Sequence, residues 1–218
     1  MKIVINKNAG VCWGVERAID MAHETVHANP HEKIISLGPL VHNPEVVEDF
    51  WQKGVEVASE LKMAASGGAQ TVIFRSHGVP VDLYQEAEHR GLKVVDATCP
   101  FVKRSQNYAR RFSGQGYTDI VVGDKHHPEM KSVESFIEGP HLISMDVADL
   151  QKIPSDQKVG VIAQTTVPYA LLHTMIEAAK RRFPEVKVHD TICDATKIRQ
   201  EEAAELAVQV QCMIVIGG

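Results

Sequence analysis

One strand-to-helix unit with a cysteine at its turn recurs three times along the sequence. The three cysteines are Cys12, Cys99 and Cys193, and they are separated by intervals of similar length. Each follows a short β-rich run and precedes a segment with helical spacing of apolar residues. A repeat of this length indicates that one structural unit has been copied, so the chain is constrained to form related lobes with its thiols at equivalent turns.

The runs that flank the cysteines define the expected elements. Strands are predicted at residues 2–6, 93–97, 187–191 and 213–217, and helices after Cys12, from Pro100, and around 198–210. Strands that alternate with helices through short turns predict parallel sheets in α/β layers, whose ligands collect at the carboxyl ends of the strands. We therefore expect a pseudo-threefold trefoil of α/β lobes, with lobes at 1–96 and 97–191 and a truncated third lobe at 192–218.

Polar residues also recur at matched places in the first two units. His42 and His127 both follow a β-rich run and precede a proline and a glutamate, which are Glu45 and Glu129. Further along, His77 and Thr165 end equivalent runs. Each complete unit therefore offers a thiol and two further polar groups at strand ends.

This set of groups suggests a specific chemistry. A thiol at a helix N-terminus has its pKa lowered by the helix dipole and the free N–H groups, which prepares it to bind metal. Three such thiols could hold a cubane iron-sulfur cluster, which usually takes four, and would leave one iron open to substrate. Imidazole and hydroxyl groups suit a diphosphate, and Glu129 could deliver protons.

Composition limits the partners. The 218 residues include 23 Lys and Arg against 28 Asp and Glu, a net charge of −5, and no basic cluster stands out. We therefore expect no nucleic-acid or membrane partner, and we expect a local site for any small anion. No apolar run is long enough to span a bilayer, and the cysteines are too dispersed for a disulfide framework, so we expect a cytoplasmic protein.

One cysteine falls outside this interpretation, and two alternative functions remain beside it. Cys212 lies outside the repeat, in an apolar run, and is predicted to be a buried structural thiol. His23 and His27 match the spacing of a zinc-protease helix motif, so a zinc hydrolase is one alternative. However, both histidines share a polar stripe with Glu16 and Asp20 that should face water. A non-enzymatic iron-sulfur sensor or binding module is the other alternative.

Seven motifs together resemble one known family. They lie at residues 10–18, 41–43, 76–79, 96–100, 127–129, 164–166 and 192–196. In order and content they are similar to the 4-hydroxy-3-methylbut-2-enyl diphosphate reductases, also called IspH or LytB. That family continues with a Ser-x-Asn loop and a later serine in its third lobe, which these 218 residues lack, so we expect an open pocket and impaired catalysis.

The resemblance implies a function for each matched residue. Its members form a trefoil around a 4Fe-4S cluster and carry out the two-electron reductive dehydroxylation of an allylic diphosphate to isopentenyl and dimethylallyl diphosphates, with a small electron-transfer protein, ferredoxin or flavodoxin, as reductant. By analogy Cys12, Cys99 and Cys193 hold the cluster. The implied catalytic residues are Glu129, Thr165 and His127. The implied substrate contacts are His42, His77, His127, Thr165, Thr166 and Thr196.

Overall fold

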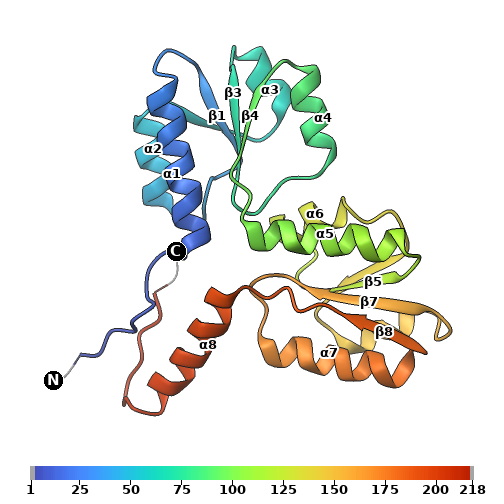
Figure 1. The fold of residues 1–218 in the computed structure, drawn as a ribbon. Coiled ribbons are helices and arrows are strands. Elements are labelled where there is room, and N and C mark those ends of the chain that lie inside the picture. Colours follow the sequence, from blue (N-terminus) through green and yellow to red (C-terminus); the bar gives the residue numbers. More distant parts are fainter. Residues whose placement is uncertain (1–2, 217–218) are drawn as a thin grey trace.

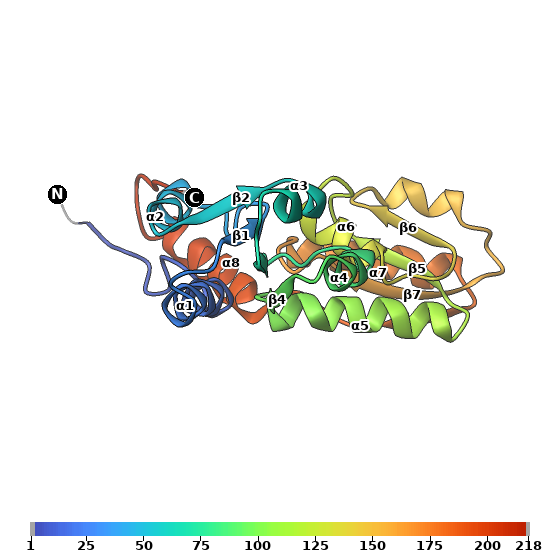
Figure 2. The ribbon, with the colours of Figure 1, turned by 90° about the horizontal axis from the view of Figure 1, so that it is seen from above.

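Two parallel four-stranded sheets form the framework of the protein (Figures 1 and 2). The computed structural model describes residues 3–216. The first sheet has the order β2-β1-β3-β4, and the second has the order β6-β5-β7-β8. Every neighbouring pair of strands in both sheets runs parallel. The predicted α/β class with parallel sheets is confirmed, and the two sheets share one topology, as copies of a single unit should.

The first sheet is covered by helices on both faces. Its strands are β1 (Ile34–Leu37), β2 (Val55–Ala58), β3 (Thr71–Phe74) and β4 (Lys93–Asp96), and its helices are α1 (Trp13–Ala28), α2 (Pro44–Gln52), α3 (Leu61–Ser66) and α4 (Asp82–His89). In β3, Ile73 packs in the same core as α1 and α2, whereas Val72 and Phe74 pack with α3 and α4. This two-sided burial explains why β1 and β3 are buried at every residue.

The second sheet repeats this layering. Its strands are β5 (Thr118–Val122), β6 (His141–Ser144), β7 (Lys158–Ala163) and β8 (Glu185–Val188); around it lie α5 (Pro100–Gly114), α6 (Pro128–Glu134), the 3-10 helix η1 (Val147–Lys152) and α7 (Tyr169–Arg182). Helices α5 and α6 contribute Phe112 and Met130 to one core. On the other face, Leu172 and Met175 of α7 pack in a second core. Across the described residues, no helix has the length and apolar character that a membrane crossing requires.

Helix α8 (Asp194–Ala207) lies apart from both sheets, beside the N-terminal segment (Figure 1). It contains no buried residue. Its contacts with the N-terminal segment are polar: the Arg199 guanidinium donates to the carbonyls of Asn8 and Gly10, at 3.1 and 2.7 Å. The predicted helix thus exists, although it begins and ends earlier than the expected 198–210. The lobe boundaries at 96 and 191 stay predictions.

Two of the predicted strands are wrong over the described residues. Residues 3–6 and 213–216 form no strand, while Lys2 and Gly217 lie outside the described part of the chain. A strand needs a hydrogen-bonded neighbour, and the apolar side chains of both segments face solvent instead: Ile3 is 74% and Ile216 90% exposed.

Cys212, beside the second segment, is exposed rather than buried as predicted. The strand predicted at 93–97 is confirmed as β4. The strand predicted at 187–191 overlaps β8, which begins and ends a few residues earlier in the sequence.

Candidate functional site

The three repeated cysteines occupy the same structural position. Cys12 is the N-cap of α1, Cys99 that of α5 and Cys193 that of α8. All three are free and half-buried. Because each thiol precedes the first turn of a helix, each lies beside backbone N–H groups that have no partner within the helix.

The Cys12 and Cys99 thiols also lie close to one another. A Cβ atom built on Gly14 would come within 2.6 Å of the Cys99 sulfur and 3.9 Å of the Cys12 sulfur, so both sulfurs border one small space. Burial raises the pKa of the Cys99 thiol, and the negative charges of Cys12 and Cys193 raise it further, against the N–H groups of Phe101 and Val102. The lowered pKa expected from the helix dipole is therefore wrong for Cys99. A thiolate there needs a positive partner, and a bound metal provides one.

Backbone hydrogen bonds connect the cysteine turns to the polar strand ends. The Cys99 N–H donates to the carbonyl of Ser76 at 2.9 Å, directly beside His77. The Cys193 N–H donates in the same way to the carbonyl of Thr165, at 3.1 Å. The thiols and the predicted substrate contacts therefore belong to one connected end of the two sheets.

Three histidines from both lobes meet at this end. The rings of His42 and His77 are 4.4 Å apart between centroids, and the His127 ring lies 6.0 Å from the first and 5.6 Å from the second. One nitrogen from each ring can be chosen so that all lie within 4.8 Å of one another. The repeat alignment is not exact, because His127 is the N-cap of α6 whereas His42 precedes Asn43, the N-cap of α2.

Burial determines the charge of two of these rings, His77 and His127. It lowers the pKa of His77 to about 3, and the charges of His42, His127 and Arg75 act in the same direction. Burial also lowers the pKa of His127, and the charges of His42 and Arg75 act in the same direction against the opposing charge of Asp124. Both rings are therefore neutral near pH 7, where each offers one N–H donor and one nitrogen lone pair.

The tautomer of His127 favours an anion over a metal ion at this cluster. Its Nδ1 accepts a hydrogen bond from the Glu129 N–H at 3.1 Å, which places the ring proton on Nε2. That Nε2–H is a donor, which suits a phosphate oxygen rather than a metal. The His77 Nδ1 is enclosed by the protein and has no hydrogen-bond partner among the described residues.

Glu129 is a buried acid next to the histidines. Its carboxylate accepts hydrogen bonds from the N–H and the hydroxyl of Thr165, and its side chain is almost fully enclosed, with 1% of the residue exposed. Burial raises its pKa to about 7, although the Thr165 hydrogen bonds act the other way. A carboxyl group with this pKa can both hold and release a proton near neutrality. Its sequence counterpart Glu45 is exposed, which explains why the repeat alone does not identify the acid.

The other predicted contacts already have partners in the protein. The Thr196 hydroxyl lies 3.0 Å from the Cys193 sulfur, and its N–H lies 3.3 Å from the same atom. The exposed Thr166 accepts a hydrogen bond from the Gln164 side chain at 3.0 Å. Thr196 thus acts on a thiol, and both threonines stay predicted substrate contacts.

The alternative zinc pair is not assembled into a site. The His23 ring packs on Phe50 with 4.6 Å between ring centroids, and His27 is exposed. Within residues 3–216, His42, His77 and His127 make the one group of three potential ligands whose ligand atoms all lie within 4.8 Å of one another, and neither His23 nor His27 belongs to it. The helix motif therefore lacks the third ligand that a catalytic zinc requires.

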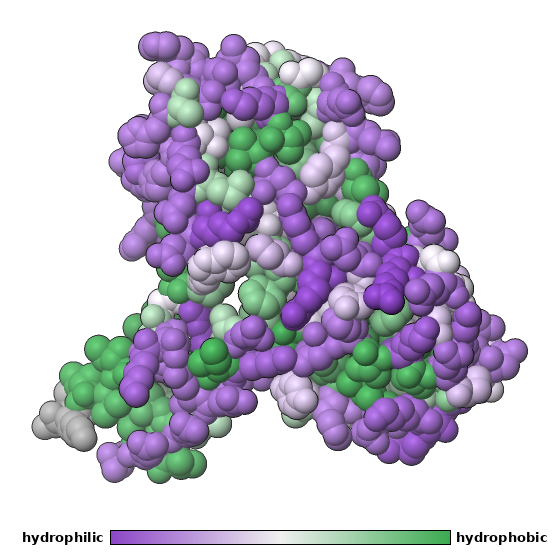
Figure 3. Space-filling model, viewed as in Figure 1, coloured by the Kyte–Doolittle hydropathy of each residue, from purple (hydrophilic) through white to green (hydrophobic). Residues whose placement is uncertain are grey.

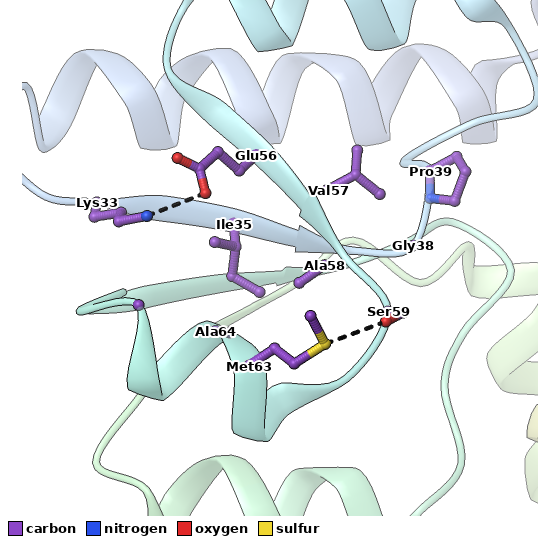
Figure 4. Close-up of a pocket in the computed structure, with 11 residues that line it drawn as sticks. Lys33, Ile35, Gly38, Pro39, Glu56, Val57, Ala58, Ser59, Met63 and Ala64 are labelled. Carbon is purple, nitrogen blue, oxygen red and sulfur yellow. Dashed lines mark hydrogen bonds and ion pairs between the residues drawn. The ribbon is translucent and has the colours of Figure 1, made fainter.

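A separate pocket of about 420 Å³ lies beside β2 and α3 (Figure 4). Its lining includes Lys33, Glu56 and Met63 but none of the predicted site residues. Lys33 and Glu56 form an ion pair at 3.1 Å, so this lysine is already neutralised. Neither a thiol nor a histidine reaches the pocket. The space-filling view instead shows an opening where the two lobes and α8 meet (Figure 3).

Sequence reasoning missed one charged residue at the site. Arg75 directly follows β3, two residues before His77, and its charge acts on both His77 and His127. A basic residue at the end of a buried strand, next to a predicted ligand, was the available signal.

Comparison with known proteins agrees with this geometry. The family model described as LytB protein matches residues 3–218. The 4-hydroxy-3-methylbut-2-enyl diphosphate reductases of Geobacter sulfurreducens and Trichlorobacter lovleyi are 45% and 44% identical over 218 residues, which is all of this chain and 76% of each relative.

Solved structures give the same match. A structure of (E)-4-hydroxy-3-methyl-but-2-enyl diphosphate reductase, the terminal enzyme of the non-mevalonate pathway, has a TM-score of 0.80 at 34% identity, covering 99% of this chain and 76% of its own. The Plasmodium falciparum reductase has a TM-score of 0.84 at 25% identity, covering 92% of this chain and 63% of its own.

Proposed function

The chain belongs to the LytB protein family, and on that premise we propose that it reduces (E)-4-hydroxy-3-methylbut-2-enyl diphosphate to isopentenyl and dimethylallyl diphosphates. It is an oxidoreductase of isoprenoid biosynthesis by the non-mevalonate pathway. The observation that carries the proposal is the combination, at connected strand ends, of three helix-capping thiols, a cluster of three histidines and a buried acid.

Cys12, Cys99 and Cys193 are the proposed ligands of a 4Fe-4S cluster. Their chemistry fits this cofactor, because all three are free and half-buried and the charges of Cys12 and Cys193 both act on Cys99. In addition, Cys12 and Cys99 border a space that a side chain on Gly14 would fill. When bound, such a cluster supplies electrons and, with three thiolates in place of four, an iron that is open to the substrate hydroxyl. The Thr196 hydroxyl and N–H contact the Cys193 sulfur and would stabilise its thiolate.

The histidines are the proposed binding site for the diphosphate. The Nε2–H of His127 is fixed as a donor by the hydrogen bond at its Nδ1, and the neutral His77 ring supplies one further N–H. His42 comes from the loop before α2, where Asn43 accepts hydrogen bonds from the Glu45 and Val46 N–H groups and so fixes the turn. Each neutral hydrogen bond contributes about 1 kcal/mol.

Glu129 and Thr165 are the proposed proton carriers. The overall reaction consumes two electrons and two protons per substrate: one proton leaves with the hydroxyl as water, and the other joins the allyl carbon skeleton. Because Glu129 contacts Thr165 through both oxygens, a proton on the carboxyl group can pass to the threonine hydroxyl as that hydroxyl donates its own proton onward. The electrons would come from a small electron-transfer protein, a ferredoxin or a flavodoxin.

The decisive experiment is anaerobic purification followed by iron and sulfide analysis, visible absorption and EPR. We expect a brown protein with four irons, loss of the cluster on Cys12→Ser, Cys99→Ser or Cys193→Ser, and no loss on Cys212→Ser, the matched control at the exposed cysteine. Addition of the allylic diphosphate should change the EPR spectrum. Colourless protein from iron-replete cells would contradict the proposal, whereas a cluster that ignores the diphosphate would favour a sensor.

A further inference from the structure

Arg75 carries a permanent positive charge next to the histidines without an acidic partner, and we propose that its guanidinium binds the diphosphate of the substrate. The inference rests on the proposed function, because it adds a charged binding residue to the same site. Neither the repeat nor the family resemblance pointed to this residue.

The guanidinium is held against the loop that carries His42. A Cβ atom built on Gly38 would lie 2.6 Å from Nη1 of Arg75, 3.3 Å from its Cζ and 3.6 Å from its Cδ. Gly38 has φ +75 and lies between β1 and His42. The arginine side chain therefore lies along the backbone of this loop, in a place that exists because residue 38 has no side chain.

The charge of Arg75 is not neutralised by the protein. No salt bridge among residues 3–216 includes it, and its Nε is buried without a hydrogen-bond partner. Burial lowers the pKa of the guanidinium, and no carboxylate offsets this effect. A half-buried, unpaired cation destabilises a protein, and an anionic ligand would remove that penalty.

The guanidinium also lies near the histidines of both lobes. Its charge helps to lower the pKa of His77, in its own lobe, and of His127, in the other lobe. Since these rings are neutral near pH 7, they offer hydrogen bonds to a diphosphate but no net charge. Arg75 supplies the missing charge, and a guanidinium can bind phosphate oxygens through two parallel N–H groups.

The competing explanation is that Arg75 only packs against Gly38. Three variants separate the two roles. Arg75→Met keeps an extended apolar stem and removes the charge, and Arg75→Lys keeps the charge and removes the fork. Arg90→Met is the matched control, because Arg90 lies in the same lobe in an exposed i,i+4 pair with Glu86 at 2.8 Å and its loss changes the net charge equally.

The test is calorimetric titration of inorganic pyrophosphate into the anaerobically prepared protein, with melting temperature and cluster absorption recorded for each variant. We expect Arg75→Met to weaken pyrophosphate binding roughly tenfold or more, the factor that corresponds to about 1.4 kcal/mol. Arg75→Lys should recover part of the loss, and Arg90→Met should bind as the wild type does. The pKa of His127, measured by NMR, should rise in Arg75→Met, which a loss of packing alone would not produce.

Three results would overturn the inference. One is wild-type affinity in Arg75→Met. Another is equal loss in Arg75→Met and Arg75→Lys together with a lowered melting temperature, because this would assign the residue to packing. The third is a wild-type protein that carries its cluster but binds no pyrophosphate, which leaves the cluster assignment intact. Conversely, pyrophosphate binding that depends on Arg75 in a protein that never forms a cluster would contradict the proposed function alone.

Discussion

Both carboxylate oxygens of Glu129 are occupied by a single residue, Thr165, which donates its N–H to one and its hydroxyl to the other, each at 2.7 Å. This pairing crosses from the N-terminus of α6 to the loop after β7, so it fixes the acid relative to the Cys193 turn, which bonds to the Thr165 carbonyl. The acid is thereby shielded from water and tied to one hydroxyl. In the proposed reaction, its proton would reach the substrate through that hydroxyl rather than through bulk solvent.

Replacement of this acid is expected to stop proton delivery while the cluster remains. Glu129→Gln keeps the size of the side chain but removes the proton that titrates at a pKa of about 7. General acid catalysis contributes a factor of roughly 10² to 10⁴, and anaerobic turnover should fall by that amount with unchanged cluster absorption. The control is Glu45→Gln, because Glu45 is the exposed sequence counterpart of Glu129, and this variant should retain full turnover. Turnover within threefold of the wild type in Glu129→Gln would exclude this acid.

Gly14 tests the space between the thiols. Gly14→Ala would place a Cβ 2.6 Å from the Cys99 sulfur and 3.9 Å from the Cys12 sulfur, so one thiol must move. We expect iron content to fall by half or more while the helices stay folded by circular dichroism. Gly114→Ala is the matched control, because Gly114 ends α5 and a Cβ there meets no atom within 4 Å. Full iron content in Gly14→Ala would show that the thiols do not need this space.

Asp119 should make the folded protein less stable as the pH rises. Asp119 lies in β5 with none of its surface exposed to solvent, and neither of its carboxylate oxygens has a hydrogen-bond partner among the described residues. Burial raises the pKa of Asp119 from 3.8 to about 7, against the opposing effect of His141 on the neighbouring strand. Because the folded pKa exceeds the unfolded one, the folded state holds its proton between about pH 4 and 7, and the associated stability is lost as the pH rises through about 7.

Asp119→Asn removes this titration. Urea unfolding at pH 5 and pH 8 should show that the wild type loses up to about 2.7 kcal/mol more than the variant, because the proton difference persists over roughly two pH units of this interval. Glu129, whose pKa is also raised to about 7, contributes a loss of the same sign to both proteins, so the difference between them isolates Asp119. Equal losses in the two proteins would mean that the carboxyl group of Asp119 ionises freely.

The sequence predicts those parts of the fold that depend on local pattern. Two helix starts are predicted correctly, one from Pro100 at the first turn of α5 and one from the apolar spacing after Cys12. The β-rich runs that alternate with helical segments, such as the run at β4, predict the parallel-sheet class. The apolar run at 213–216 misleads because a strand is decided by its neighbour, which local pattern does not reveal. The same reason explains Cys212, whose predicted burial depended on that strand.

The site is predictable only as far as the repeat defines it. The cysteine positions emerge from three copies of one turn, but the raised pKa of Cys99 depends on its burial near two other thiols, which no single turn encodes. Arg75 is a comparable case, because its importance depends on the absence of an acidic neighbour and on the open space at Gly38. Both properties arise from packing between distant segments.

His77 should produce the opposite pH dependence from Asp119. Burial lowers its pKa from 6.5 to about 3, so the folded protein excludes a proton that the unfolded chain accepts. The stability that His77 contributes is therefore present above pH 6.5 and is lost as the pH falls toward about 3, at about 1.4 kcal/mol per pH unit. Between pH 6.5 and 5 the wild type should lose about 2 kcal/mol that His77→Gln does not lose, measured by urea unfolding. Identical slopes would mean that the folded protein protonates His77 as readily as the unfolded chain does, and that burial does not exclude the proton.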